Sequence, residues 1–478
     1  MVYTDGTGRM SPRRKNTTRR TDKAGSKEDG IEADDPNMKR RPLMRTLRDS
    51  NPVMLVIYGY IAYIVVGALL LIVPFSQAET VPFLDNVFVS ASAVSTTGLS
   101  PVNISEDYNA FGQGVILFLI QIGGIGYMTF SSFILLSSRK ELTDERKKVS
   151  KTVFSIPKDF LIERFLVRVV LFTAAIETLG AIALYFIFRS EGVRTPLWQA
   201  IFTSISAFCT AGFSLFNGNL EQFTGNFWLN FVISILSISG AIGFIVFVDI
   251  FNKVTKKTEC LSFTTRVILR TTFWILLIGT FIVLISEGSF SDLTSGQKVM
   301  AAFFQTMTSM TTVGFNTMPI ASMAKSVLFL TVILMIIGAS PAGTGGGVKS
   351  TTLVAVIGQI RSVLFSKRDV KYWDQKVPAD RVKQANATFA MYLAALFLGV
   401  YLLALTEKAS LMEILFEATS ALGTVGLSMG FTPHLTILGK IIVILLMFVG
   451  RVGPLTFGMA IFVKNKLIWD DSRTDLAI

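Results

Sequence analysis

Thr96-Thr97-Gly98 is the first of four Thr-x-Gly tripeptides that recur along this chain of 478 residues. Each tripeptide follows a short apolar, hydroxyl-rich run and lies between two long hydrophobic segments. Successive glycines are 114, 102 and 112 residues apart, which is longer than the period of solenoid repeats. The pattern predicts one unit repeated four times, with the other copies at Thr210-Ala211-Gly212, Thr312-Val313-Gly314 and Thr424-Val425-Gly426.

The repeat extends beyond the tripeptides. A phenylalanine lies ten residues before each glycine, a hydroxyl residue six before it and a small residue five before it, and a large apolar residue follows it. Four positions that match in four copies argue against coincidence. The sets are Phe88, Ser92, Ala93 and Leu99; Phe202, Ser206, Ala207 and Phe213; Phe304, Thr308, Ser309 and Phe315; and Phe416, Ser420, Ala421 and Leu427.

The composition predicts an all-α integral membrane protein. Hydrophobic residues make up 51% of the chain and charged residues 16%, and the mean hydropathy is +0.55, which exceeds the range of ordinary soluble domains. Apolar runs long enough to cross about 30 Å of hydrocarbon occur two per repeat. They lie near 52–74, 113–138, 165–189, 226–251, 264–286, 326–360, 387–406 and 438–463.

The distribution of basic residues predicts the orientation. Residues 1–50 are rich in Arg, Lys, Asp, Ser, Thr and Gly and have too few apolar side chains to fold, so we expect a disordered basic tail. If both termini are cytoplasmic, 36 Lys and Arg lie in cytoplasmic segments and five in the opposite ones. This asymmetry agrees with the positive-inside rule, and it accounts for a net charge of +12 without nucleic acid, since basic loops favour the anionic inner leaflet.

Between the two spans of each repeat lies a segment too short to cross the membrane and too apolar to remain in water. We expect each to be a half-helix that enters from outside and ends at Thr-x-Gly, because irregular backbone at that depth must line a cavity or be covered by protein. Glycine allows the carbonyl groups to turn inward, and the helix C-termini add negative charge for a cation. The segments are about 82–95, 196–209, 298–311 and 410–423.

With these features the chain resembles the potassium-translocating membrane subunits of the Trk/Ktr/HKT superfamily, over about 50 to 465. No additional span precedes the first repeat, so the bacterial Ktr type is the nearer resemblance. The resemblance implies a selectivity filter for potassium. Family members with serine in place of the glycine of the first filter segment often carry sodium, and all four copies here have the glycine. The filter segments are Ser95-Thr96-Thr97-Gly98-Leu99, Cys209-Thr210-Ala211-Gly212-Phe213, Thr311-Thr312-Val313-Gly314-Phe315-Asn316 and Gly423-Thr424-Val425-Gly426-Leu427.

The sixth apolar run must break near its middle. Five glycines and a proline fall within ten residues, which cannot continue a helix. The stretch reads Gly338-Ala339-Ser340-Pro341-Ala342-Gly343-Thr344-Gly345-Gly346-Gly347. Discontinuous helices at that depth mark ion pathways. In the resembling family this position is the intramembrane gating loop, and a passive kink is the alternative.

Two cations near this break are candidate gate residues. Arg451 lies within the last apolar run, where a guanidinium is costly and normally faces a pore or the protein interior. The resemblance implies a cation below the filter that contacts the gating loop, and snorkelling toward the cytoplasmic face is the alternative. Lys349 is nearer a membrane boundary, so both readings stay open. The predicted gate comprises Gly338, Gly343, Gly345, Gly346, Gly347, Lys349 and Arg451.

Other polar residues carry weaker signals. Glu177 is a mid-membrane carboxyl group outside the pore segments: a coupling-ion ligand, one side of an interhelical hydrogen bond, or a protonated acid. Cys209 and Cys260 fall at different depths, which excludes a disulfide and a cysteine metal site. His434 is expected to be a solvated loop residue. No His, Cys or carboxylate cluster has the spacing of a metal site or a catalytic triad, so the chain is not expected to be an enzyme and carries no predicted cofactor.

The sequence therefore predicts channel-like potassium uptake at the cell membrane. Only the third and fourth segments read Thr-Val-Gly, which predicts weaker selectivity, with sodium binding or sodium dependence left open. The resemblance implies a homodimer and a cytosolic nucleotide-binding ring as a regulatory partner, and a coupled carrier remains the alternative. The predicted divisions are the tail 1–50 and repeats 51–138, 139–251, 252–360 and 361–478.

Overall fold

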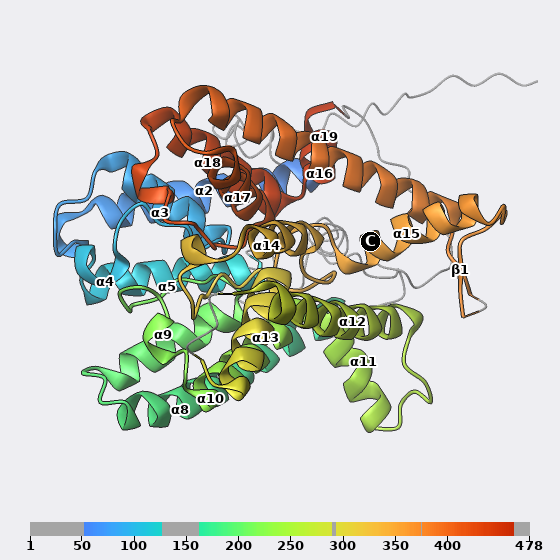
Figure 1. Cartoon of the computed structure of the whole chain (residues 1–478), viewed down its shortest axis with the longest axis horizontal. Coiled ribbons are helices and arrows are strands. Elements are labelled where there is room, and N and C mark those ends of the chain that lie inside the picture. Colours follow the sequence, from blue (N-terminus) through green and yellow to red (C-terminus); the bar gives the residue numbers. More distant parts are fainter. Residues whose placement is uncertain (1–51, 127–161, 289–292, 374, 463–478) are drawn as a thin grey trace, which may run out of the picture. The chain divides into compact units, whose positions relative to one another are not determined.

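The computed structural model describes residues 52–126, 162–288, 293–373 and 375–462 (Figure 1). The expected tail 1–50, most of the basic segment 139–164 and the end of the chain from 463 lie outside the described residues. The described part is almost entirely helical. Its strands are one short antiparallel pair, β1 (Lys371–Tyr372) and β2 (Gln375–Lys376).

Each repeat begins with a long apolar helix, as expected from its uninterrupted hydrophobic run. In the first three repeats, one glycine of this helix lies where the following half-helix packs. A Cβ atom at Gly67 or at Gly180 would lie 2.5 Å from a serine Oγ of the half-helix. Small residues of this kind let helices approach closely in membranes. The first helices are α2 (Pro52–Ile72), α8 (Ile162–Ser190), α12 (Phe263–Ser286) and α16 (Ala379–Thr406).

A half-helix comes next in each repeat, within a few residues of the expected bounds. Helix-initiating residues mark the N-termini of these helices. Pro196 is the first residue of α9, and Ser410 and Glu413 form a capping box at the start of α17. Each half-helix packs against the first helix of its own repeat. The half-helices are α3 (Phe83–Val94), α9 (Pro196–Phe208), α13 (Ser295–Thr311) and α17 (Leu411–Gly423).

The second helices are shorter than the sequence suggested. We expected only the run 326–360 to break, but the helices in 113–138, 226–251 and 438–463 also end early. Each ends at a glycine with positive φ, at Gly126 (87°), Gly243 (96°), Gly338 (58°) and Gly453 (91°). A residue with positive φ cannot continue a right-handed helix, and glycine adopts positive φ without steric cost. The second helices are α5 (Ala110–Ile125), α10 (Phe227–Ile242), α14 (Lys325–Ile337) and α18 (Ile437–Val452).

The chain continues differently beyond each of these glycines. After Gly243 the chain turns by 95° into α11 (Phe244–Val254). After Gly338 it forms the predicted glycine-rich loop and resumes as α15 (Ser350–Leu364). After Gly453 it resumes as α19 (Pro454–Phe462). Beyond Gly126 the first repeat lies outside the described residues. A second helix that breaks and resumes is thus shared by the second, third and fourth copies rather than confined to the third.

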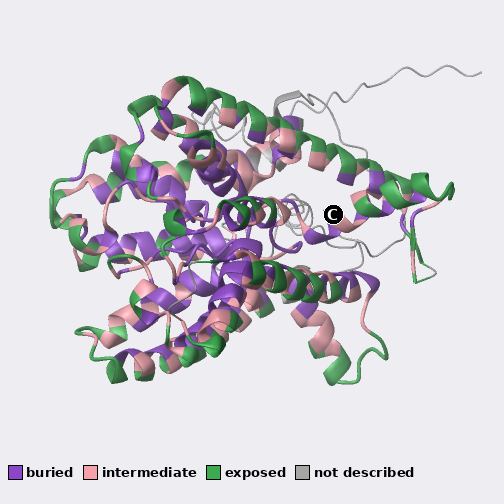
Figure 2. Cartoon of the chain, in the orientation of Figure 1, coloured by how far each residue is buried: buried purple, intermediate pink, exposed green. Residues whose placement is uncertain are grey.

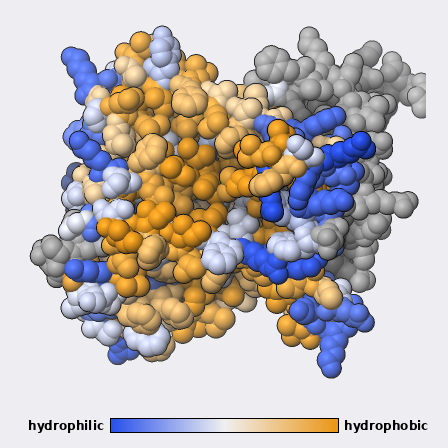
Figure 3. Space-filling view, turned by 45° about the vertical axis from the view of Figure 1, so that its right-hand side comes forward, coloured by the Kyte–Doolittle hydropathy of each residue, from blue (hydrophilic) through white to orange (hydrophobic). Residues whose placement is uncertain are grey.

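Burial is distributed as in a membrane protein. Buried residues concentrate around the half-helices and α14, whereas the outer helices expose large apolar side chains (Figure 2), such as Leu179 on α8 and Phe281 on α12. On one face, a broad apolar belt lies between hydrophilic side chains (Figure 3). Among the described helices, α8, α12 and α16 are long and apolar enough to cross a membrane, and α10 with α11 makes a fourth if the bent pair is one span. The all-helical membrane fold is confirmed.

Short elements and one ion pair join the repeats. Lys440 Nζ on α18 lies 2.5 Å from Asp85 Oδ1 on α3, and both side chains are largely buried. This pair links the fourth repeat to the first. His434 is exposed, as expected. The connecting elements are η2 (Pro74–Ser76), α4 (Ile104–Asp107), η3 (Glu221–Phe223), η5 (Ile320–Ser322) and η6 (Thr432–His434).

Candidate functional site

The four Thr-x-Gly tripeptides form a closed ring. A Cβ atom added at Gly98 would lie 2.3 Å from Ala211 O of the second tripeptide. The same relation takes Gly212 to Val313 O at 2.3 Å, Gly314 to Val425 O at 2.0 Å and Gly426 to Thr97 O at 2.1 Å. Each glycine therefore lies against the middle carbonyl group of the next copy, and the fourth copy meets the first. Only a residue without a side chain allows this approach, which explains why glycine occupies all four positions.

The threonine of each tripeptide is also in the left-handed conformation. The φ values are 51° at Thr96, 51° at Thr210, 59° at Thr312 and 49° at Thr424. A β-branched residue in this region is strained, and such strain clusters at functional sites. The sequence predicts unusual backbone angles at the glycines only. The recurrence of threonine at a position that glycine would occupy at lower cost indicates that its hydroxyl group is needed there.

The hydroxyl residue six positions before each glycine fixes the segment after the half-helix. Ser92 Oγ accepts a hydrogen bond from Gly98 N at 3.1 Å, and Ser420 Oγ accepts one from Gly426 N at 3.0 Å. In the other two copies the hydroxyl group donates a hydrogen bond to the carbonyl oxygen of the residue after the glycine. Ser206 Oγ donates to Phe213 O at 2.8 Å, and Thr308 Oγ1 donates to Phe315 O at 2.7 Å. The repeated hydroxyl group is therefore a clamp on the ring segments.

The four threonine hydroxyl groups of the ring fall into two kinds. Thr210 Oγ1 donates to Thr344 Oγ1 at 3.1 Å, and Thr312 Oγ1 accepts from Gly346 N at 3.0 Å. Thr96 Oγ1 and Thr424 Oγ1 are buried and have no hydrogen-bond partner among the described residues. Buried hydroxyl groups normally have partners. Thr424 Oγ1 lies against Gly346, where a Cβ atom would be 2.2 Å from it, whereas Thr96 Oγ1 is left for a ligand. Oxygen atoms of this type suit a hard monovalent cation.

The glycine-rich loop, residues 338–349, lies directly against one side of the ring. We call the side covered by this loop the far side of the ring. We call the opposite side, from which the half-helices approach, the entry side. Thr344 Oγ1 donates to Phe208 O at 3.1 Å, at the end of α9. Cβ atoms at Gly345 and Gly346 would lie 2.7 Å from Thr311 O and 2.4 Å from Gly423 O, at the ends of α13 and α17. The loop therefore covers the C-termini of three half-helices.

Backbone hydrogen bonds join the two ends of the loop to each other and its middle to α10. Its two ends meet through Ala339 N to Gly346 O at 3.0 Å and Val348 N to Ile336 O at 2.9 Å. Its middle bonds the broken end of α10, from Thr344 N to Gly240 O at 3.0 Å. It contains one strained residue, Ala342, at φ 56°. The loop is thus a defined structure, held by backbone hydrogen bonds that local motion can break.

Arg451 and Lys349 both bind backbone carbonyl groups of this loop region. Arg451 Nη1 donates to Thr344 O in the loop, and Arg451 Nη2 donates to Gly123 O on α5. Lys349 Nζ donates to Gly345 O at 2.6 Å. Arg451, from the fourth repeat, thereby joins the loop of the third repeat to the first. The structure brings these two residues together with the glycines of the predicted gate.

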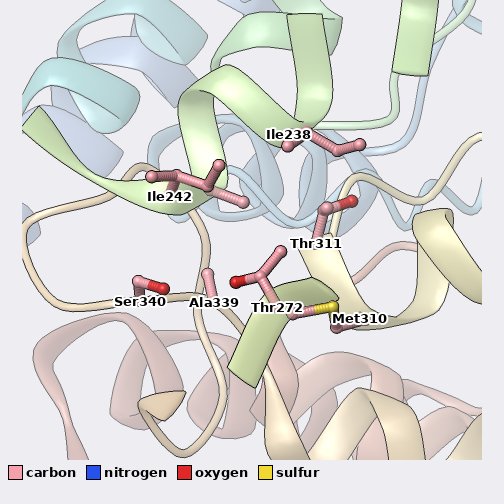
Figure 4. A pocket seen from close by; sticks show the side chains of 8 residues that line it. Ile238, Ile242, Thr272, Met310, Thr311, Ala339 and Ser340 are labelled. Carbon is pink, nitrogen blue, oxygen red and sulfur yellow. The ribbon is translucent and has the colours of Figure 1, made fainter. Parts of the chain in front are cut away.

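A narrow apolar pocket lies beside the start of the loop. Figure 4 shows Ile238 and Ile242 of α10, Thr272 of α12, and Met310 of α13 around Ala339 and Ser340. Thr272 Oγ1 is buried without a hydrogen-bond partner in the described part of the chain. The pocket lies next to the residues at which the loop leaves α14 and is too narrow to admit a water molecule.

Glu177 lies behind the second segment of the ring. Its Oε2 accepts from Gln121 Nε2 at 3.0 Å and its Oε1 accepts from Cys209 Sγ at 3.6 Å. Ser204 Oγ donates to the backbone oxygen of Glu177 at 2.7 Å. The carboxyl group is therefore engaged by α5 and by the end of α9, which favours the interhelical hydrogen bond over a free ion ligand. Cys260 is exposed and Cys209 is buried, so the two thiol groups do not pair.

On the entry side, polar loops cover the ring segments. Asn316, two residues after Gly314, donates from Nδ2 to Glu221 Oε1 at 2.8 Å. Desolvation raises the pKa of Glu221 above its ordinary value, while the Asn316 hydrogen bond lowers it. Leu220 N donates to Asn316 O at 3.1 Å. These contacts hold the second and third copies together at the mouth of the ring.

The chain is similar to known cation transporters over most of its length. The family model described as TrkH, cation transport protein, matches residues 36–467. The chain is 35% identical to the Ktr system potassium uptake protein B of Bacillus subtilis over 434 residues, 90% of this chain and 96% of that protein. It is 33% identical to the potassium/sodium uptake protein NtpJ of Enterococcus hirae over 437 residues, 89% of this chain and 95% of that protein.

A solved structure shares the fold. The potassium transporter TrkH of Vibrio parahaemolyticus matches with a TM-score of 0.70 at 18% identity, covering 87% of this chain and 86% of that one. These findings confirm the expectation of a transporter rather than an enzyme. The chain belongs to the TrkH family of cation transport proteins.

Proposed function

We propose that this protein takes up potassium across the cell membrane through the ring of Thr-x-Gly segments. The observation that carries the proposal is the closed ring, in which four glycines lie against the carbonyl groups of neighbouring copies and two threonine hydroxyl groups have no partner among the described residues. Carbonyl and hydroxyl oxygens can replace the water around a potassium ion. No carboxylate lies within the four tripeptides, which disfavours a divalent cation. The choice of potassium comes from the names of the relatives: one is a potassium uptake protein and the other a potassium/sodium uptake protein.

The proposed filter includes every residue of the four tripeptides. They differ in their middle residue, which contributes a carbonyl oxygen whatever its side chain. The first and second copies have threonine and alanine there, so the ring is less regular than four identical segments. This supports a filter that also binds sodium. The filter residues are Thr96, Thr97, Gly98, Thr210, Ala211, Gly212, Thr312, Val313, Gly314, Thr424, Val425 and Gly426.

The loop 338–349 would be the gate. It bonds the hydroxyl groups of Thr210 and Thr312, two of the four on the ring, so an ion leaving on the far side meets protein rather than water. Arg451 adds a positive charge against the same loop. Opening requires the loop to leave the ring and to break its hydrogen bonds to Thr210 and Thr312. The proposed gate residues are Gly338, Gly343, Gly345, Gly346, Gly347, Lys349 and Arg451.

The entry side would be extracellular and both termini cytoplasmic. The described far-side segments 252–270 and 361–386 hold 12 Lys and Arg against five on the entry side, which supports this orientation. A homodimer and a cytosolic nucleotide-binding ring complete the proposal. The relative from Bacillus subtilis is named as one protein of a Ktr system, which supports a partner protein. The far-side segments offer basic surfaces for such a ring.

Flux through the purified subunit in liposomes tests the proposal. Potassium flux should exceed sodium flux, follow the membrane potential and rise when residues 340–345 are removed, because the shortened loop no longer reaches Thr210 and Thr312. The measurement is tracer uptake against imposed potentials without a partner protein. Saturating, voltage-insensitive uptake that requires a sodium or proton gradient would contradict the proposal.

The alternative is a coupled carrier that uses Glu177 as its ion ligand. In Glu177→Gln the amide oxygen can accept from Cys209 Sγ, and the NH2 group can donate to Gln121 once the Gln121 amide turns over. We therefore expect this variant to change potassium flux by less than about twofold. Gln121→Glu is the matched comparison, since it places two acids side by side and should weaken the fold. Loss of all coupled uptake in Glu177→Gln, with normal yield of folded protein, would favour the carrier.

A further inference from the structure

We propose that α11 is a binding site for anionic phospholipid of the inner leaflet and that lipid bound there holds the gating loop against the ring. The inference rests on the proposed gate and orientation. It concerns the helix that begins after the bend at Gly243, together with the lysines at its end. None of the filter or gate residues named above lies on α11.

The position of α11 fits a membrane surface. The 95° bend turns α11 away from the axis of α10, so α11 runs nearly perpendicular to that helix (Figure 1). Asp249 Oδ2 accepts a hydrogen bond at 2.8 Å from Ser262 N, where the spanning helix α12 begins. The middle of α11 is therefore level with the start of a spanning helix, near the boundary between hydrocarbon and headgroups.

The side chains of α11 match that boundary. Its first turns pack inward, with Phe244 and Phe247 against the aromatic rings of Phe208 and Phe172. Its last turn presents apolar side chains to the outside, with Phe251 53% exposed and Val254 76% exposed. Apolar side chains at the end of an amphipathic helix are buried when the helix lies in the lipid interface.

The charges beside these apolar groups select an anionic headgroup. Lys253, Lys256 and Lys257 are all exposed, and Lys257 Nζ lies 5.9 Å from the centre of the Phe251 ring. Glu259 is the one acidic residue among 253–260, and Asp249 is engaged by Ser262. The segment is thus net positive, and basic residues next to interfacial apolar groups attract anionic lipid.

The opposite end of α11 is bonded to the gating loop. Phe244 N donates to Ala342 O at 3.1 Å, and Ser340 N donates to Ala241 O at 2.9 Å. A Cβ atom at Gly243 would lie 2.3 Å from Pro341 O. The bend is therefore the surface on which the loop rests, and a helix anchored in the interface fixes that surface. Bound anionic lipid should stabilise the loop in the position seen here and lower basal flux.

The test compares vesicles of phosphatidylcholine alone with vesicles of phosphatidylcholine and phosphatidylglycerol in equal parts. Wild-type potassium flux without a partner should be about fivefold lower in the vesicles with phosphatidylglycerol, the low end of coupling between two sites. The triple variant Lys253→Gln, Lys256→Gln and Lys257→Gln should remove this difference. Native mass spectrometry of the same variant should show fewer retained phosphatidylglycerol molecules than wild type.

The matched control removes the same charge from another far-side surface. Lys367→Gln, Arg368→Gln and Lys371→Gln change three exposed cations near β1 and should keep the lipid dependence. Equal flux in both vesicles for wild type, or higher flux with phosphatidylglycerol, would overturn the inference. So would a lipid dependence that survives in the α11 triple variant or is lost equally in the control. A protein without the residues 340–345 that conducts no potassium in either vesicle would instead overturn the proposed function.

Discussion

Replacement of Gly314 by alanine is expected to lower potassium flux by at least about tenfold and to reduce the preference for potassium over sodium. The new Cβ atom would lie 2.0 Å from Val425 O, a backbone atom of the next ring segment that cannot rotate away. Gly314 also has φ 81°, where a side chain is strained. The steric overlap and the backbone strain together cost roughly 2–5 kcal/mol. We expect the ring to reduce this cost by moving its carbonyl groups apart.

Gly296→Ala is the matched control. Gly296 belongs to the same repeat, on α13, and a Cβ atom there meets no described atom within 4 Å. This variant should keep both flux and ion preference. Tracer uptake of potassium and sodium in liposomes, after a check that each variant elutes as a single species, provides the measurement. If Gly314→Ala retains wild-type flux and preference, the ring is not the filter.

The second large effect is expected at Arg451. Arg451→Gln should raise basal potassium flux by about tenfold or more, because the loop loses a charge-assisted hydrogen bond at Thr344 O and its link to Gly123 O on α5. Hydrogen bonds to charged groups contribute about 1.5–3 kcal/mol each, so a partial loss is enough to shift the loop. The potassium preference should not change, since the hydrogen bonds of Arg451 go to the loop and to α5 rather than to the four tripeptides.

Arg451→Lys separates the two roles of the guanidinium group. Lysine keeps the positive charge but lacks the planar fork that reaches two carbonyl groups at once. If the hydrogen bonds hold the loop, the lysine variant should leak like the glutamine variant, whereas low flux in the lysine variant would assign the barrier to charge alone. Unchanged flux in Arg451→Gln would exclude Arg451 from the gate.

The sequence predicts the half-helices and the ring because their signals are local and repeated. The glycine alignment places all four half-helices within a few residues, since each must end where its tripeptide begins. The hydroxyl residue at Ser92 and its equivalents is visible in the sequence, but its role as a clamp requires the hydrogen bonds to Gly98 N and Phe213 O. The order of the copies around the ring also needs the structure, because spacing along the chain does not fix neighbours.

The early end of α5 and the broken second helices of the second and fourth repeats are not predicted by the sequence. A single glycine in an apolar run is tolerated in a membrane helix, so Gly126, Gly243 and Gly453 gave no separate signal. A second glycine lies three residues earlier, at Gly123, Gly240 and Gly450, and Gly240 and Gly450 abut Phe208 O and Leu422 O at the ends of half-helices. This shared Gly-x-x-Gly spacing could have revealed the breaks.

The Asp85–Lys440 ion pair has a consequence for how the molecule is made. Its two members are 355 residues apart in the chain, so at about 5–20 residues per second the first half-helix waits roughly 20–70 s for its partner during synthesis. For that interval Asp85 is without its cation, and Gly426 has not yet reached Thr97. The nascent protein is therefore an open arc with an exposed polar edge in the bilayer, and chains that stall before residue 440 should be preferred substrates of membrane quality-control proteases.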